Sequence, residues 1–213
     1  MIKLITTVNW HQQEAASSLL PRLCRLLPDG CRISQALESP ATEFDLLLEH
    51  YSDSPRVLDE LYRQFADQAI LTSYLVEEYV EKDEPGLSAG TGALGRKLIS
   101  GWFPRSDVSM EQARRHWNEH VPLANRIHIG CRRYVRNWVR SLARASGDFP
   151  PLYAGFAFQY YATEEDLAER MFDKPESATL IQRDVEEFIA AYAVQICSER
   201  VHDALLSAGE ASA

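Results

Sequence analysis

The sequence predicts an α+β protein built from two successive units that share one element order, β-α-β-β-α-β. Three observations support this prediction: a period-two alternation at the N-terminus, a helical spacing of leucines directly after it, and the return of the same order after about 95 residues. The composition agrees, because 46% of the 213 residues are hydrophobic and 25% are charged, as in an ordinary folded chain.

The first half begins with a strand and continues with a helix. Between residues 2 and 10 apolar side chains alternate with polar ones, and apolar residues then recur at helical spacing until Pro28 and Gly30 end the run. Pro55 stands at the start of the second helix, where its missing N–H costs nothing. The expected elements are strands over residues 2–10, 31–39, 44–51 and 71–80 and helices over residues 12–27 and 56–69.

The second half repeats this order after a segment rich in glycine. Four Gly and one Pro fall within residues 81–95, which breaks any regular period and predicts a linker or a long loop. The expected elements are strands over residues 97–103, 131–141, 153–162 and 191–197 and helices over residues 109–127 and 164–188.

This element order predicts two ferredoxin-like units in tandem, each with its helices on one face of an antiparallel sheet. The bare face of each sheet must stay wet or be buried, and two units in one chain can pack these faces together as an α/β barrel. The interior of such a barrel could hold a small ligand. The expected boundaries are a diverged ferredoxin-like unit over residues 1–84, a linker over 85–95, and a second unit with a C-terminal tail over 96–213.

The charge of the chain excludes some classes of partner. With 22 Lys and Arg against 31 Asp and Glu the net charge is -9, so neither nucleic acid nor an acidic membrane surface is an expected partner. Residues 1–84 hold 7 Lys and Arg and 15 Asp and Glu, a balance of -8, which leaves 15 against 16 for the rest. No apolar run is long enough to span a membrane, so we expect a cytoplasmic protein. A homodimer stays open.

No metal site is expected from the spacing of the possible ligands. The four cysteines show no C-x-x-C pair, so we interpret them as buried free thiols rather than zinc ligands. His116 and His120 form an H-x-x-x-H pair, but the glutamate of a zincin is out of place and no third ligand is evident.

The same two histidines are the leading catalytic candidates. On a helix, His116 and His120 share a face, and imidazole is the side chain that most easily exchanges a proton near neutral pH. The alternative is structural, with both rings capping carbonyls or packing at the helix end.

Five arginines between Arg132 and Arg144, with no acidic residue among them, form a basic stripe on the following strand. The stripe could bind a carboxylate or phenolate through forked guanidinium contacts, or it could pair with the acidic first half, and we favour pairing. Aromatic residues then crowd the strand over residues 153–162, which suits core packing or the wall of a site for a flat ligand.

Three segments resemble the EthD family within the dimeric α/β-barrel superfamily. They are Arg114-Arg-His-Trp-Asn-Glu-His-Val-Pro-Leu, Gly130-Cys-Arg-Arg-Tyr-Val-Arg-Asn and Asp184-Val-Glu-Glu-Phe, and the resemblance covers residues 97–197. His120 takes the place of the motif histidine, while Asp184 and Phe188 match positions of mainly structural meaning. Trp117 stands only three residues before His120, where relatives often place an aromatic residue at four.

The resemblance implies relatives that work without metal or redox cofactor on aromatic, polyketide-like or lactone substrates, as cyclases, dehydratases or isomerases. We therefore expect a cofactor-independent lyase or isomerase, with His120 and His116 moving a proton on a hydrophobic small molecule. Arg133 or Arg136 would stabilise a developing enolate or phenolate. The expected lining residues are Tyr134, Trp102 and Tyr160. The alternatives are a non-catalytic barrel that binds a hydrophobic metabolite and a haem-binding barrel.

Overall fold

The structure is a computed structural model that describes residues 2–12, 16–37, 43–53, 57–84, 94–148 and 150–202. Most of the predicted linker, residues 85–93, and the predicted C-terminal tail from residue 203 onward lie outside the described residues. Within the described ranges, no helix is both long enough and apolar enough to cross a membrane.

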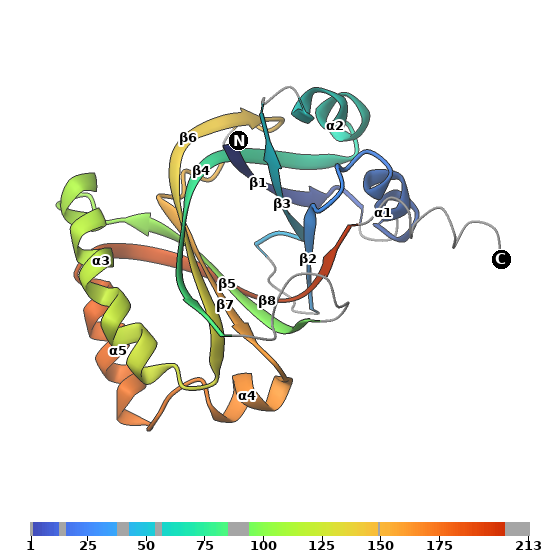
Figure 1. The fold of residues 1–213 in the computed structure, drawn as a ribbon. Helices are drawn as coiled ribbons and strands as arrows, with labels where there is room; N and C mark the ends of the chain where they lie inside the picture. The colour runs from blue at the N-terminus through green and yellow to red at the C-terminus, as the bar shows by residue number, and fades with distance from the viewer. Residues whose placement is uncertain are drawn as a thin grey trace. The chain divides into compact units, whose positions relative to one another are not determined.

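The helices and strands follow the predicted order along the chain (Figure 1). The strands are β1 (Ile2–Trp10), β2 (Arg32–Ala36), β3 (Leu46–Ser52), β4 (Ala69–Asp83), β5 (Leu94–Pro104), β6 (Cys131–Ala145), β7 (Gly155–Tyr161) and β8 (Ile189–Val201). The helices are α1 (Ala16–Cys24), α2 (Val57–Phe65), α3 (Met110–Ile127), α4 (Glu164–Glu169) and α5 (Glu176–Glu186).

One predicted helix is divided in the structure. The helical region expected over residues 164–188 forms α4 and α5, and the chain between them leaves the helical conformation after Arg170. Pro175 lies immediately before α5, where a proline begins a helix without loss of a backbone hydrogen bond. The break gives α5 a start of its own, independent of α4.

The protein has an α+β fold with a closed antiparallel barrel of eight strands. The strands are hydrogen-bonded in the order β1-β3-β2-β8-β5-β7-β6-β4. β1 pairs with β3 and β4, and β7 pairs with β5 and β6, all antiparallel. These registers are continuous apart from a shift between Cys131 and Arg133 where β6 pairs with β7.

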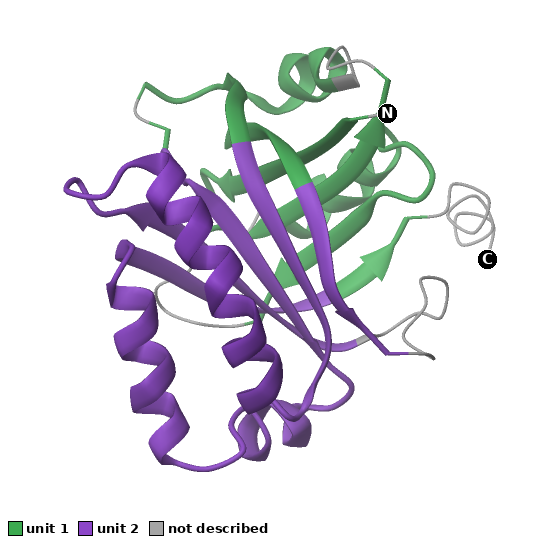
Figure 2. Cartoon of the chain, turned by 60° about the vertical axis from the view of Figure 1, so that its left-hand side comes forward, with its two compact units in different colours: residues 1–77, 140–151, 199–213 green, residues 78–139, 152–198 purple. Residues whose placement is uncertain are grey.

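The chain divides into two compact units that are interleaved in sequence (Figure 2). Unit 1 comprises residues 1–77, 140–151 and 199–213, and unit 2 comprises residues 78–139 and 152–198. The division passes through β4, β6 and β8, so each of these long strands contributes to both units. The consecutive boundaries expected from the sequence stay a prediction.

Unit 1 has its core where α1 and α2 pack on the sheet. Leu4 of β1, Leu23 of α1 and Phe65 of α2 are fully buried in one cluster. Two polar features are also buried in this unit. Lys3 and Glu49 form an ion pair with 2.7 Å between Nζ and Oε2 on the face of the sheet opposite Leu4, and neither ring nitrogen of His50 has a hydrogen-bond partner among the described residues.

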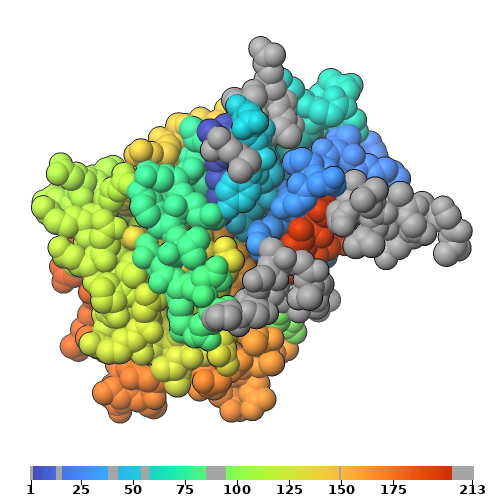
Figure 3. Space-filling model, in the orientation of Figure 1, coloured from blue at the N-terminus to red at the C-terminus, as the bar shows by residue number. Residues whose placement is uncertain are grey.

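Unit 2 carries α3 and α5 side by side on one face of its sheet (Figure 1). α3 begins with a capping box, in which Ser109 and Gln112 each satisfy a backbone N–H of the other. Its buried face includes Ala113, Trp117 and His120, and its exposed residues form part of the surface seen in Figure 3.

A close approach of helix and sheet occurs over a glycine of β7. Gly155 pairs with Trp102 of β5 and with Trp138 of β6. A Cβ atom at Gly155 would lie 2.6 Å from Cζ3 of Trp117 and 2.8 Å from Nε1 of Trp102. Only glycine therefore lets the indole rings of helix and sheet meet at this point.

Candidate functional site

A cavity of about 480 Å³ lies in unit 2, lined by the helix-covered face of the sheet together with α3 and α5. Leu98, Trp102 and Tyr134 form its floor, and Val185 and Phe188 contribute from the α5 side. From the sequence we expect a ligand in the barrel interior, whereas this cavity lies on the opposite, helix-covered side of the strands.

The lining of the cavity is uncharged and largely apolar. None of its described residues is Lys, Arg, Asp or Glu. Along β8, three apolar side chains that line it are partly open to solvent, with exposed fractions of 45% for Tyr192, 46% for Val194 and 40% for Ile196. Desolvating a charge in such surroundings is costly, so the cavity favours a neutral, apolar ligand.

His120 places a basic nitrogen on the cavity wall. It lies on the buried face of α3, and its Nδ1 is 2.6 Å from Oδ2 of Asp184 on α5. A carboxylate accepts hydrogen bonds, so Nδ1 carries the proton in the neutral ring and Nε2 has a free lone pair. No described residue forms a hydrogen bond with Nε2.

The surroundings of His120 keep its ring neutral near pH 7. Burial lowers the pKa of His120, and the hydrogen bond and negative charge of Asp184 oppose this shift in part. A neutral imidazole can accept a proton from a ligand, and Asp184 then stabilises the imidazolium that forms. The pair thus has the arrangement of a general base with an orienting carboxylate.

His116 lies on the other side of the same carboxylate. Its Nε2 is 3.7 Å from Oδ1 of Asp184, and it lines an outer crevice of about 230 Å³ instead of the cavity. The Phe188 ring lies 5.0 Å from the His116 ring and 6.3 Å from the His120 ring, and it lines both spaces. The structure therefore brings both predicted histidines to Asp184, but only His120 reaches the cavity.

Tyr134 and Trp102, both expected to bind the ligand, line the cavity. The hydroxyl of Tyr134 accepts a hydrogen bond of 3.3 Å from Nε1 of Trp117, and burial raises the pKa of Tyr134. The hydroxyl therefore stays protonated and can donate its hydrogen. Trp102 packs edge-on against Trp117 and Phe188, with ring centroids 5.1 Å and 5.4 Å away.

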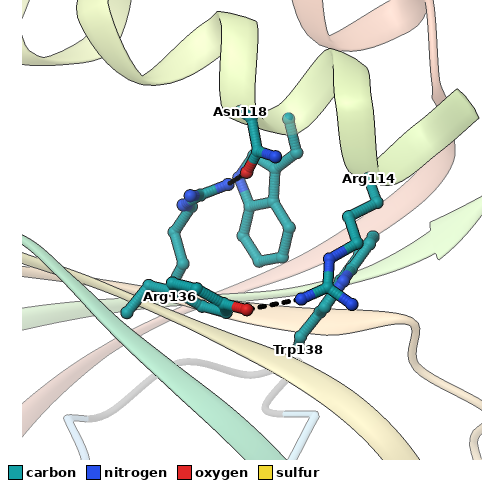
Figure 4. A pocket seen from close by; sticks show the side chains of 6 residues that line it. Arg114, Asn118, Arg136 and Trp138 are labelled. Carbon is teal, nitrogen blue, oxygen red and sulfur yellow. Dashed lines mark hydrogen bonds between the residues drawn. The ribbon is translucent and has the colours of Figure 1, made fainter. Parts of the chain in front are cut away.

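Arg136 does not line the cavity. Its Nε donates to Oε1 of Glu81 and its Nη1 to Oδ1 of Asn118, both at 2.9 Å, and its guanidinium lies over the Trp117 ring. Figure 4 shows the narrow crevice where Arg136 and Asn118 meet, beside the bond between Arg114 and the Tyr79 hydroxyl. With Nη2 also donating to Glu81, each nitrogen of the guanidinium makes one hydrogen bond, so Arg136 is positioned to hold β4, β6 and α3 together.

Arg133 and Tyr160 are likewise absent from the cavity wall. The guanidinium of Arg133 is 5.7 Å from the Tyr160 ring, and its Nη1 is 3.4 Å from Oδ2 of Asp83. Of the five substrate-binding residues expected from the sequence, the structure thus brings Tyr134 and Trp102 to this cavity and leaves Arg133, Arg136 and Tyr160 outside it.

All five arginines of the basic stripe pair with acidic residues of the first half. The pairs are Arg132 with Glu84, Arg133 with Asp83, Arg136 with Glu81, Arg140 with Glu77 and Arg144 with Asp59. This confirms the pairing alternative. The stripe neutralises the concentration of acidic residues on β4, which explains why the two charge patterns occur in one chain.

Two features of the site were not assigned from the sequence. Asp184 appears there only as a matched position, although it is the partner of His120. His128, at the end of α3, lines the cavity and is buried, with its Nδ1 2.7 Å from the carbonyl oxygen of Met171. Its position directly after the last helical residue was the available signal. Over the described part of the chain, no group of three or more His, Cys, Asp or Glu side chains is placed to hold a metal ion.

One known protein family matches part of the chain that forms this site. Residues 105–191 match the family model described as the EthD domain. This part of the chain is therefore similar to EthD domains. The matched span includes all of α3 and α5, and so it contains His116, His120, His128 and Asp184. The resemblance of the sequence to the EthD family is thereby confirmed.

Solved structures extend the comparison to both halves of the chain. An anthrone oxidase-like protein superposes with a TM-score of 0.62 at 11% identity, covering 94% of this chain and 93% of its own. A candidate monooxygenase from Fusobacterium nucleatum has a TM-score of 0.57 at 10% identity, covering 95% and 93%. One from Lactobacillus acidophilus has a TM-score of 0.52 at 11% identity, covering 94% and 96%. At such identities the chain shares the fold alone with these proteins.

Among curated proteins, none matches the sequence of this chain significantly.

Proposed function

We propose that this protein is a small-molecule enzyme of the lyase or isomerase type, in which His120 removes a proton from a flat, uncharged substrate without a metal or redox cofactor. The observation that carries the proposal is the hydrogen bonding and position of His120. Its Nδ1 is hydrogen-bonded to Asp184, and the residue lines a large, uncharged cavity. A base in these surroundings acts on a weakly acidic C–H or O–H group of a neutral ligand.

The chemical step is a proton transfer within the cavity. Nε2 of His120 takes the proton, and Asp184 stabilises the imidazolium through the bond to Nδ1. The electron pair left on the substrate moves to a conjugated oxygen, towards which the Tyr134 hydroxyl could donate a hydrogen bond. Return of the proton to another carbon completes an isomerisation, and return to a departing hydroxyl group completes a dehydration.

In this proposal Tyr134, and not Arg133 or Arg136, stabilises the negative charge that develops on the substrate. Arg133 and Arg136 are held in ion pairs outside the cavity, whereas Tyr134 lies on its floor with a hydroxyl that keeps its proton. A neutral donor also fits the uncharged lining better than a buried guanidinium does, because no counter-ion is needed.

Oxygenation is a second candidate, favoured by the descriptions of the structural neighbours as anthrone oxidase-like and monooxygenase proteins. It would begin with the same removal of a proton and differ in that the substrate then gives its electrons to dioxygen. Haem binding receives less support, because none of the described lining residues is a Lys or Arg that could pair with haem carboxylates.

Anthrone is a suitable probe, since it is a flat, neutral ketone with an acidic methylene group. In D2O without air, the protein should accelerate exchange of the methylene hydrogens, followed by proton NMR. His120→Asn preserves a nitrogen at the position of Nδ1 for Asp184 and removes Nε2, so exchange should return to the rate without protein. His11→Asn, at an exposed histidine of unit 1, is the matched control.

Full exchange activity in the His120→Asn protein would remove the basis for the proposal. In air, consumption of dioxygen during the reaction would select the oxygenase candidate over the lyase or isomerase. If the wild-type protein binds anthrone but neither exchanges nor oxidises it, a non-catalytic binding barrel is the better assignment.

We also propose that the fold is a tandem of two ferredoxin-like units, with the first over residues 1–84 and the second over residues 96–213. The strand orders β4-β1-β3-β2 and β8-β5-β7-β6 are the same within the two halves, which supports this division. Whether two chains form a homodimer can be measured by light scattering on a sizing column.

A further inference from the structure

We infer that His128 is a second recognition residue of the cavity, which accepts a hydrogen bond from a hydroxyl group of the ligand. The inference rests on the proposed function, because it takes the same cavity as the substrate site. It names the substrate class more narrowly as an apolar compound that carries a hydroxyl donor.

The tautomer of His128 is set by the backbone. Its Nδ1 lies 2.7 Å from the carbonyl oxygen of Met171, which can only accept, so Nδ1 carries the hydrogen and Nε2 is an acceptor. The ring is further held by Phe172, whose centroid is 5.3 Å away. The orientation of the acceptor is thus fixed before any ligand binds.

The acceptor of His128 is left for the ligand. No described residue bonds to its Nε2, whereas the residue itself is 8% exposed and lines the cavity. Burial lowers the pKa of His128, so the ring stays neutral and Nε2 keeps its lone pair near pH 7. An acceptor in an otherwise apolar wall gains most from a ligand that carries a hydroxyl donor.

The two histidines line the same cavity from different points of one element. His120 lies on the buried face of α3, and His128 is the cap residue directly after its end. Apolar side chains, among them Leu98 and Trp102, occupy the floor of the cavity that both rings line. A ligand that offers a proton to His120 and a hydroxyl to His128 must therefore be apolar between these two groups.

The test uses 1-hydroxypyrene and 1-methoxypyrene, which share a flat ring system and differ in the hydroxyl donor. Binding is followed by the fluorescence of each probe. His128→Asn retains a donor for the Met171 carbonyl and removes Nε2, and it should weaken binding of 1-hydroxypyrene about tenfold, with 1-methoxypyrene changed by less than about twofold. His128→Gln, which returns a polar group near the position of Nε2, should recover part of the loss. His11→Asn is again the control for a histidine outside the cavity.

Equal loss for both probes in the His128→Asn protein would show a packing role and overturn the inference, as would no loss for either. If His128→Asn does not fold, the comparison of His128→Gln with wild type decides. A loss of affinity that is larger for 1-hydroxypyrene than for 1-methoxypyrene supports the inference, whereas an equal loss for both probes or no loss for either overturns it. The proposed function fails separately, through anthrone exchange that persists in His120→Asn.

Discussion

The bond between His120 and Asp184 provides the most direct test of how the cavity works. Asp184→Asn changes one oxygen to an amide and removes the negative charge, while the shape of the side chain and its place on α5 stay the same. In the wild-type protein the carboxylate of Asp184 lies 2.6 Å from Nδ1 of His120 and stabilises the protonated ring more than the neutral one. We expect the variant to fold normally and to be a weaker catalyst of proton transfer.

The magnitude follows from the kind of bond that is lost. A hydrogen bond to a charged group contributes about 1.5–3 kcal/mol, which corresponds to a decrease of about 10- to 100-fold in the rate of a step that forms the imidazolium. The assay is exchange of the anthrone methylene hydrogens in D2O, measured as kcat/KM between pH 4 and pH 9. Asp107→Asn, at an exposed carboxylate before α3, is the matched control.

The direction of the pH dependence gives a second criterion. The base must be neutral to act, and burial already lowers the pKa of His120, with Asp184 partly reversing this shift. In Asp184→Asn the pKa of His120 should fall further, so the acidic limb of the rate profile should move to lower pH while the plateau drops. A limb that moves to higher pH, or a plateau equal to that of wild type, would refute the role of the carboxylate.

Three further predictions concern stability. Burial lowers the pKa of His50 from 6.5 to about 4, so the free energy of unfolding of the wild-type protein falls as the pH decreases through this window. Urea unfolding should show a decrease of about 3 kcal/mol from this residue between pH 7.5 and pH 4, and His50→Leu should abolish that decrease. Gly155→Ala should cost about 1–3 kcal/mol, with a changed tryptophan emission, because the added methyl group meets the Trp117 ring at 2.6 Å; a neutral effect would mean that the ring moves freely. Glu81→Gln, which leaves a buried guanidinium without its counter-ion, should cost about 1–3 kcal/mol, whereas Asp59→Asn at an exposed pair should cost less than about 1 kcal/mol; equal costs would contradict the argument from burial.

The order of helices and strands could be predicted because each element has its own local period of apolar residues. The alternation over residues 2–10 and the helical spacing over residues 109–127 correspond to β1 and α3. The division of the last helical region was not predicted, since the apolar spacing continues across it and only Pro175 indicates a new start. The helix expected over residues 12–27 is shorter in the structure, where α1 ends at Cys24.

The location of the site could not be read from the strands. On β7, Phe156 and Phe158 face one way and Ala157 and Gln159 the other, so the more aromatic face suggests the ligand site, although the cavity lies on the other face. Alternation shows that a strand has two faces, but it does not show which face the helices cover.

The partners of the predicted residues were hidden for the same reason. His120 is found from its spacing on one helix, whereas Asp184 lies 64 residues later and reaches it only because α3 and α5 pack side by side. The arginine stripe shows the opposite case. A block of one charge in one half and the other charge in the other half is a long-range signal, and the five observed pairs agree with it.

Phe188 has a consequence for how the range of accepted molecules could change. Its ring lines both the cavity and the outer crevice, and it comes from the turn between α5 and β8, whereas the two histidines lie on α3. The size limit of the binding space is therefore set by a side chain that performs no chemistry. Exchanging that ring for a smaller group would enlarge the binding space, while the hydrogen bond between His120 and Asp184, which does not involve Phe188, would be retained. In such an architecture, a single substitution can change which ligands bind without replacing a residue that transfers the proton.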